Sequence, residues 1–192
     1  MIFSRSRLSI LVAVALLPLA HLFSSFPIAR FEQETITIDI HPDHITVDGV
    51  YFYRNPYPFP IVQGLSIPLP ADASHPMPVT MQVEELSPRP QVLGMRNLWG
   101  APRFDLSLQR NEIVCLRVRY YQQAPASNAR YILTTTKPWL RPLLSGDYRL
   151  IPHGVTLLQS NYPVVEGIKG VVQFRRAQFM PPHDWIFSWK TP

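Results

Sequence analysis

Twenty-one prolines, spread along a chain of 192 residues, limit the folds open to this sequence more than any other feature. A proline inside a helix removes a backbone hydrogen-bond donor and clashes with the preceding turn, so the sequence argues against long helices. Hydrophobic residues make up 46% of the chain and charged residues only 16%, which gives enough apolar surface to offset the entropy cost of ordering. We therefore expect a packed core built from strands and turns.

Hydrophobicity alternates with a period of two along much of the sequence between residues 34 and 189. Ile36, Ile38 and Ile40 alternate with polar residues, and the alternation resumes at Ile45, so residues 41–44 are predicted to form the turn of a hairpin. Residues 48–49 predict a second turn or a bulge. Further strands are predicted over residues 64–69, 78–84, 103–109, 112–121, 129–136, 146–151, 155–159, 171–175 and 185–189. So many short strands predict an all-β fold for residues 31–192, an antiparallel β-sandwich with a barrel as the alternative.

Residues 112–121 form the longest alternating segment and contain neither proline nor glycine, so we expect a central strand there. Its core face is predicted to consist of Val114, Leu116, Val118 and Tyr120. Cys115 falls on the opposite face. As the only cysteine it cannot form an intrachain disulfide, and with no base indicated beside it we interpret it as a structural thiol.

Three aromatic residues alternate close to the end of the sequence: Trp185, Phe187 and Trp189. We expect them to belong to a final strand that closes the sandwich. The alternative is an interfacial belt of aromatic side chains in contact with a membrane.

An N-terminal stretch of 22 residues, 8–29, contains no Asp, Glu, Lys or Arg. That length spans the hydrocarbon core of a bilayer, and Arg5 and Arg7 before it predict a cytoplasmic N-terminus. We therefore expect residues 1–30 to be a transmembrane signal anchor and residues 31–192 to be a periplasmic or extracellular domain. Because no good Ala-x-Ala site follows the apolar core, a cleaved signal and a secreted domain form the alternative.

The formal charge of +5 does not describe one basic surface. Arg5, Arg7 and Arg30 border the apolar stretch, and residues 31–192 carry 15 basic and 13 acidic side chains. No basic cluster longer than Arg175 and Arg176 occurs, so nucleic acid is not expected as a partner.

Residues for catalysis or metal binding are sparse. His41, Asp43 and His44 supply three possible metal ligands, which His183 and Asp184 would complete only if the fold brought them together. We interpret the first three as a solvated turn and predict no metal, cofactor or catalytic residue. The sequence contains no nucleophile, zincin or phosphate-loop motif. Glu84 and Glu85 are neighbours on a strand and point to opposite faces, which does not suit shared acid–base chemistry.

The aromatic and proline-rich segment 51–60 is the most individual part of the sequence. Tyr51, Tyr53, Tyr57 and Phe59 are the candidate partner-binding residues, because rigid aromatic side chains anchor interfaces and stack on sugars. Packing of these residues in the core, beside an edge strand protected by proline, is the alternative.

From these features we expect a membrane-anchored envelope protein, not an enzyme, whose domain binds or supports another envelope protein. The alternatives are an extracytoplasmic enzyme with a dispersed metal or carboxylate site and a secreted carbohydrate-binding module.

Overall fold

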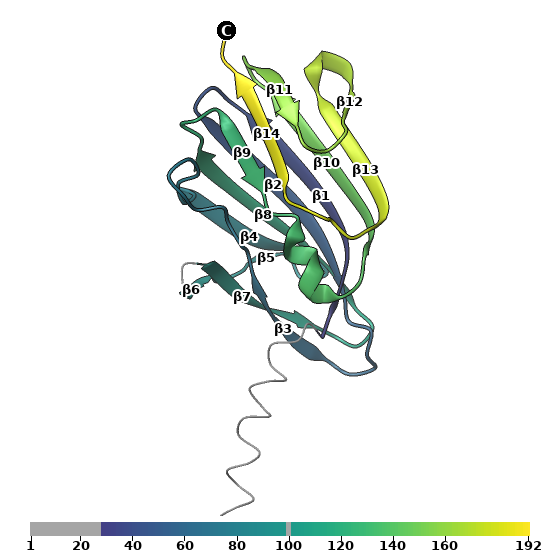
Figure 1. Ribbon diagram of the computed structural model, residues 1–192. Coiled ribbons are helices and arrows are strands. Elements are labelled where there is room, and N and C mark those ends of the chain that lie inside the picture. The colour runs from purple at the N-terminus through teal and green to yellow at the C-terminus, as the bar shows by residue number, and fades with distance from the viewer. Residues whose placement is uncertain (1–27, 99–100) are drawn as a thin grey trace, which may run out of the picture.

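The computed structural model describes residues 28–98 and 101–192, and these form a nearly all-β domain (Figure 1). Of the anchor predicted over residues 1–30, residues 1–27 lie outside the described residues, while Ala29 is buried in the domain and Arg30 begins its first strand. No helix within the described ranges is long and apolar enough to cross a bilayer.

The elements are β1 (Arg30–Ile40), β2 (His44–Arg54), β3 (Ile61–Ser66), β4 (Thr80–Ser87), β5 (Gln91–Val92), β6 (Arg96–Leu98), β7 (Ala101–Leu108), β8 (Ile113–Gln123), β9 (Asn128–Tyr131), η1 (Thr134–Trp139), β10 (Leu143–Pro152), β11 (Thr156–Ser160), β12 (Val165–Glu166), η2 (Ile168–Gly170), β13 (Val172–Phe179) and β14 (Trp185–Lys190).

The largest sheet has the strand order β12-β13-β10-β1-β2-β8-β4-β5 and stays open at both edges, so the barrel alternative is wrong. The prediction of a purely antiparallel sheet is also wrong at one pair, because β1 and β10 run parallel, from Gln33 opposite Ser145 to Ile40 opposite Pro152. Helix η1 and the turn after it lie between β9 and β10 and bring the chain to the end where β1 begins. Strand β10 therefore starts beside the start of β1 and runs in the same direction.

Two small sheets, β11-β14-β9 and β3-β7-β6, cover one face of the large sheet and give a sandwich-like arrangement of layers. Trp185 of β14 packs against Tyr148 of β10 and Phe174 of β13, with ring centroids 5.9 and 5.0 Å apart. Leu65 of β3 and Phe104 of β7 lie across a cavity from β8. The opposite face of the large sheet is polar and carries ion pairs between strands, such as Arg117 with Asp48 and Arg175 with Asp147.

The core consists of the inward-facing residues of these layers. Ile36, Ile38 and Ile40 are fully buried, as the alternation predicts. The predicted core face of β8 is confirmed, since Val114, Leu116, Val118 and Tyr120 are all buried. Trp185, Phe187 and Trp189 are also buried in β14, which confirms the final strand and leaves these rings unavailable to a membrane.

Two local predictions are wrong. Strand β2 continues through Gly49 without a turn or bulge, because the ring of Tyr51 lies over that glycine and occupies the space that a Cβ atom would need. The strand predicted over residues 129–136 ends at Tyr131, and the 3₁₀-helix η1 begins at Thr134. Asp184, the residue before β14, accepts hydrogen bonds from the backbone N–H (3.1 Å) and the hydroxyl (2.7 Å) of Thr134, which holds this helical turn.

Candidate functional site

The four aromatic residues singled out in the sequence separate into two pairs. Tyr51 and Tyr53 alternate on the inner face of β2, where Tyr53 is buried and Tyr51 is half-buried. Tyr57 and Phe59 follow on an exposed loop, where their rings stack on each other 5.3 Å apart. The structure therefore places one pair inside the domain and the other on its surface.

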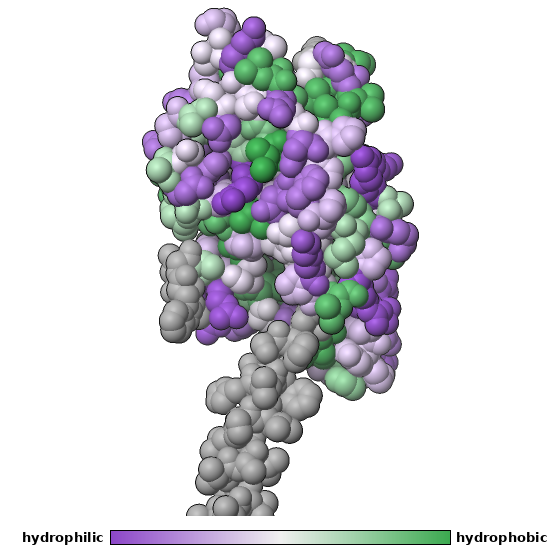
Figure 2. All heavy atoms as spheres, in the orientation of Figure 1, coloured by the Kyte–Doolittle hydropathy of each residue, from purple (hydrophilic) through white to green (hydrophobic). Residues whose placement is uncertain are grey.

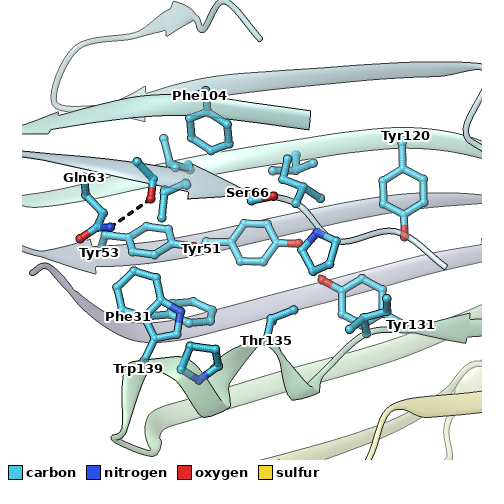
Figure 3. A pocket seen from close by; sticks show the side chains of 18 residues that line it. Phe31, Tyr51, Tyr53, Gln63, Ser66, Phe104, Tyr120, Tyr131, Thr135 and Trp139 are labelled. Carbon is cyan, nitrogen blue, oxygen red and sulfur yellow. Dashed lines mark hydrogen bonds between the residues drawn. The ribbon is translucent and has the colours of Figure 1, made fainter. Parts of the chain in front are cut away.

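Tyr51 and Tyr53 line a pocket of about 320 Å³ between the layers. Strands β2 and β8 form its floor, β3 and β7 form one wall, and β9 with η1 forms the other (Figure 3). Seven of its lining residues are aromatic: Phe31, Tyr51, Tyr53, Phe104, Tyr120, Tyr131 and Trp139. No charged side chain lines the pocket among the described residues, so it is suited to a neutral molecule.

Backbone geometry sets the position of the floor tyrosines. Tyr51 lies opposite Leu116 and Tyr53 opposite Val114 in the β2–β8 register, so their rings share the inner face with the core side chains of β8. The ring of Tyr51 lies along β2 over Gly49, and its hydroxyl is 2.7 Å from the hydroxyl of Tyr131 on β9. This hydrogen bond joins the floor of the pocket to its wall.

Two further hydroxyl groups remain available for a ligand. The Tyr53 and Tyr120 hydroxyls have no hydrogen-bond partner among the described residues, although both side chains line the pocket. Burial raises the pKa of both tyrosines, so both remain neutral. Each can donate one hydrogen bond to a ligand and accept another.

A buried carboxyl group lies near Tyr51 and Tyr53. Glu34 of β1 accepts a hydrogen bond of 2.5 Å from the Tyr148 hydroxyl. Desolvation raises the pKa of Glu34 from 4.5 to about 7, although the bond from Tyr148 opposes this shift. A register irregularity between Phe31 and Gln33 allows both Phe31 and Glu34 to point inward despite their odd spacing.

The start of the domain is fixed to the pocket wall by Gln63 of β3. Its side-chain oxygen accepts hydrogen bonds from the backbone N–H groups of Ile28 (2.7 Å) and Ala29 (3.2 Å). Its amide nitrogen donates to the carbonyl of Gly64 at 3.0 Å, as Figure 3 shows. Neither Gln63 nor Glu34 was predicted, because in the sequence both look like ordinary polar residues of a strand.

The histidines of the β1–β2 hairpin stack instead of converging. The His41 ring lies parallel to those of His44 and His153, at centroid distances of 4.3 and 4.6 Å. Asp43 pairs with His44 at 2.7 Å, and Asp39 pairs with His153 at 2.6 Å. Burial and the two neighbouring rings lower the pKa of His41.

His183 and Asp184 do not join this hairpin, because they precede β14 and lie beside Tyr162 and Thr134. Across the described ranges, no three His, Cys, Asp or Glu side chains are placed to hold a metal ion. Cys115 is buried on the outer face of β8, and burial raises the pKa of its thiol. Glu84 pairs with Arg119, while Glu85 is buried beside Arg89.

No family model matches the sequence, and no curated protein matches it. In structure the chain is similar to a protein from Legionella pneumophila named as a candidate nutrient-binding protein, with a TM-score of 0.68 over 86% of this chain and 68% of the other, at 13% identity. It also matches an M1 zinc metallopeptidase from Deinococcus radiodurans with a TM-score of 0.47 at 11% identity, covering 83% of this chain but only 42% of the peptidase. At these identities the first likeness concerns the fold alone.

Proposed function

We propose that this chain is a membrane-anchored binding domain of the cell envelope that takes a small, neutral, largely apolar molecule into the aromatic pocket. The observation that carries the proposal is the pocket itself, where seven aromatic rings surround a space bordered by Tyr53 and Tyr120. The hydroxyls of these two tyrosines have no hydrogen-bond partner within residues 28–98 and 101–192. Ligand sites are usually concave and apolar, with a few polar groups that fix orientation. The volume of about 320 Å³ lies at the lower end of the usual range, which favours a molecule of one or two rings or a short chain.

The chemistry of the walls supports binding in preference to catalysis. The pocket offers hydroxyl and amide groups but no charged side chain among its described lining residues. Its tyrosines stay neutral, so they can orient a carbonyl, hydroxyl or ether oxygen of a ligand without changing its charge. The name of the Legionella pneumophila protein refers to nutrient binding, which agrees with this proposal but does not identify the ligand.

The membrane part of the proposal depends on the uncharged stretch before the domain. Residues 8–27 contain twenty residues without Asp, Glu, Lys or Arg, enough to cross a bilayer core. In this proposal the anchor holds the pocket outside the cytoplasm. The domain then presents its ligand there to another envelope protein.

Photolabelling of the full chain in lipid nanodiscs with phenyl(trifluoromethyl)diazirine, a small neutral apolar probe, tests the pocket. We expect crosslinks to peptides that contain Tyr51, Tyr131 and Leu65. Crosslinks to residues 8–27 serve as an internal reference for a segment in contact with lipid. A Thr135→Trp variant places a large ring at the half-buried pocket residue of η1. We expect this variant to lose at least about 1.4 kcal/mol of binding free energy, which reduces pocket labelling by about tenfold or more.

The matched control is Thr156→Trp, at an exposed threonine of β11 that does not line the pocket. Its labelling should equal that of the unmodified chain. Pocket labelling that survives Thr135→Trp unchanged, or reference crosslinks without any pocket crosslinks, would show that the pocket does not bind such molecules.

A further inference from the structure

Exposed apolar side chains gather at the end of the domain where β1 begins. Arg30 lies opposite Arg54 in the register of β1 and β2, so the loop after β2 emerges at this end. Helix η1 contacts β1 and reaches this end as well. We define the basal surface as Ile28, Tyr57, Phe59 and Leu140 with the two arginines Arg30 and Arg141. The four apolar residues are 40%, 38%, 54% and 77% exposed in that order. A shallow pocket joins Ile28, Tyr57 and Arg141, and Figure 2 shows hydrophobic residues at this lower end.

The two aromatic rings of the basal surface are held rigidly. Asn55 is fully buried at the start of their loop, and its amide group donates hydrogen bonds to the carbonyls of Phe59 (2.7 Å) and Gln109 (2.9 Å). Its side-chain oxygen accepts a bond from the Tyr57 N–H at 2.9 Å. Because the loop is already ordered, exposing these rings to a partner costs little further conformational entropy.

The backbone conformation of Leu140 is a second, independent observation that indicates a function for the basal surface. It follows η1 in the left-handed region with φ of 56°, which is unfavourable for a residue that carries a Cβ atom. Glycine is the usual choice for this position at the end of a helix. A leucine held there at 77% exposure offers an apolar side chain to its surroundings and not to the core.

The charge of the basal surface is positive. Arg30 and Arg141 are exposed and form no ion pair with a described residue. The nearby carboxylate of Glu32 is already bound to Arg54 at 2.7 Å. Aromatic rings and aliphatic side chains flanked by unpaired arginines match the boundary of an anionic bilayer, where rings lie at headgroup level and cations contact phosphates.

The chain path leads to the same surface. The N–H of Ile28, the first described residue, is bonded to Gln63, and the uncharged residues 8–27 precede it directly in the sequence. An anchor in those residues would end within one residue of the basal surface.

We propose that the basal surface lies on the lipid bilayer, with Tyr57, Phe59 and Leu140 among the headgroups and with Arg30 and Arg141 at anionic phosphates. This inference rests on the anchor of the proposed function and adds a fixed orientation of the domain. Eleven residues of β1 at about 3.3 Å each separate the basal surface from the β1–β2 hairpin, so the far end stands about 35 Å away.

The test uses the full chain in vesicles of phosphatidylethanolamine and phosphatidylglycerol. In a Cys115→Ala background, Phe59→Cys carries an environment-sensitive fluorophore, and a lipid with a headgroup spin label quenches it. Gln123→Cys is the matched control, because it is exposed and pairs with His44 at the far end. We expect quenching at residue 59 to be at least about three times that at residue 123, since headgroup contact is confined to the interface.

The arginines are tested by Arg30→Gln with Arg141→Gln, which should reduce quenching at residue 59 to the level found in uncharged phosphatidylcholine vesicles. Equal quenching at residues 59 and 123 would overturn the inference. The inference would also be overturned if the label at residue 59 stays exposed in vesicles that contain no other protein and becomes shielded only in native membranes. That result would indicate a protein partner. Carbonate extraction of the vesicles separately tests the anchor, and circular dichroism confirms that each variant folds.

Discussion

Glu34 is the residue whose ionisation should most affect the stability of this domain. It is buried without an ion pair among the described residues, and desolvation raises its pKa to about 7. The folded state therefore binds a proton that the unfolded state releases near pH 4.5, so the contribution of Glu34 to stability is fully present below that pH and lost as the pH rises through about 7. A pKa difference of this size corresponds to about 3 kcal/mol.

We expect Glu34→Gln to be more stable than the unmodified chain by up to about 3 kcal/mol at about pH 8, because the amide still accepts a hydrogen bond from Tyr148 and carries no charge. Near pH 4 the two proteins should differ little. Urea unfolding of the full chain in mild detergent, followed across this pH range, measures the difference. Tyr148→Phe is the comparison, since it removes the bond that lowers the pKa of Glu34 and should make the loss larger and extend it to higher pH. A constant difference between the chains at every pH would contradict the assignment.

At this scale the sequence singled out the aromatic residues of segment 51–60 but did not show which of them face the interior. The segment with Tyr51, Tyr53, Tyr57 and Phe59 is predicted to bind, yet alternation alone does not separate the two inward-facing rings from the two exposed ones. What covers Tyr51 is Tyr131, eighty residues later. The floor of the pocket therefore depends on contacts that no local pattern contains.

At the scale of elements, β8 is the strand that the sequence described best. It lies between β2 and β4 in the large sheet, which confirms the central position predicted for residues 112–121. Leu116 is 1% exposed and also borders the pocket. We expect Leu116→Ala to lower the free energy of unfolding by roughly 2 to 5 kcal/mol, nearer the lower value because one side of Leu116 already faces a cavity and loses fewer contacts.

Ile113→Ala on the same strand is the comparison, because Ile113 is 41% exposed and its loss should cost no more than about 0.5 kcal/mol. Urea unfolding of the two variants in the same detergent measures both values. A cost below about 1 kcal/mol at Leu116 would mean that its contacts contribute much less than burial indicates.

Other elements depend on distant partners and could not be predicted locally. The threonines at 134–136 are β-branched and predicted a strand, but Asp184, just before β14, binds Thr134 and supports a helical turn there. The parallel pairing of β1 with β10 joins segments more than 100 residues apart, such as Ile36 and Tyr148. Alternation fixes which face of a strand is buried, but it carries no information about the neighbouring strand or its direction.

At the scale of the whole molecule, the domain has two distinct ends. The basal surface and Ile28 lie at one end, and the C-terminus after β14 lies at the other, as Figure 1 shows. Trp189 bonds to Ser127, whose neighbours lie beside the β1–β2 hairpin. A protein fused after residue 192 would thus be attached at the end opposite the basal surface.

This separation permits a clean test of membrane topology. Arg5 and Arg7 precede the uncharged residues 8–27, so residues 1–7 should remain in the cytoplasm and residues 31–192 should lie outside. We expect a reporter that is active only outside the cytoplasm to be active when fused after residue 192, and a fusion that lacks residues 8–27 to be inactive. The intact mass of the membrane-bound chain then distinguishes an anchor from a cleaved signal. A silent reporter on the full chain would indicate the opposite orientation. A chain shortened near residue 29 would indicate a cleaved signal and a secreted domain, because the stretch long enough to hold the chain in the bilayer would be gone.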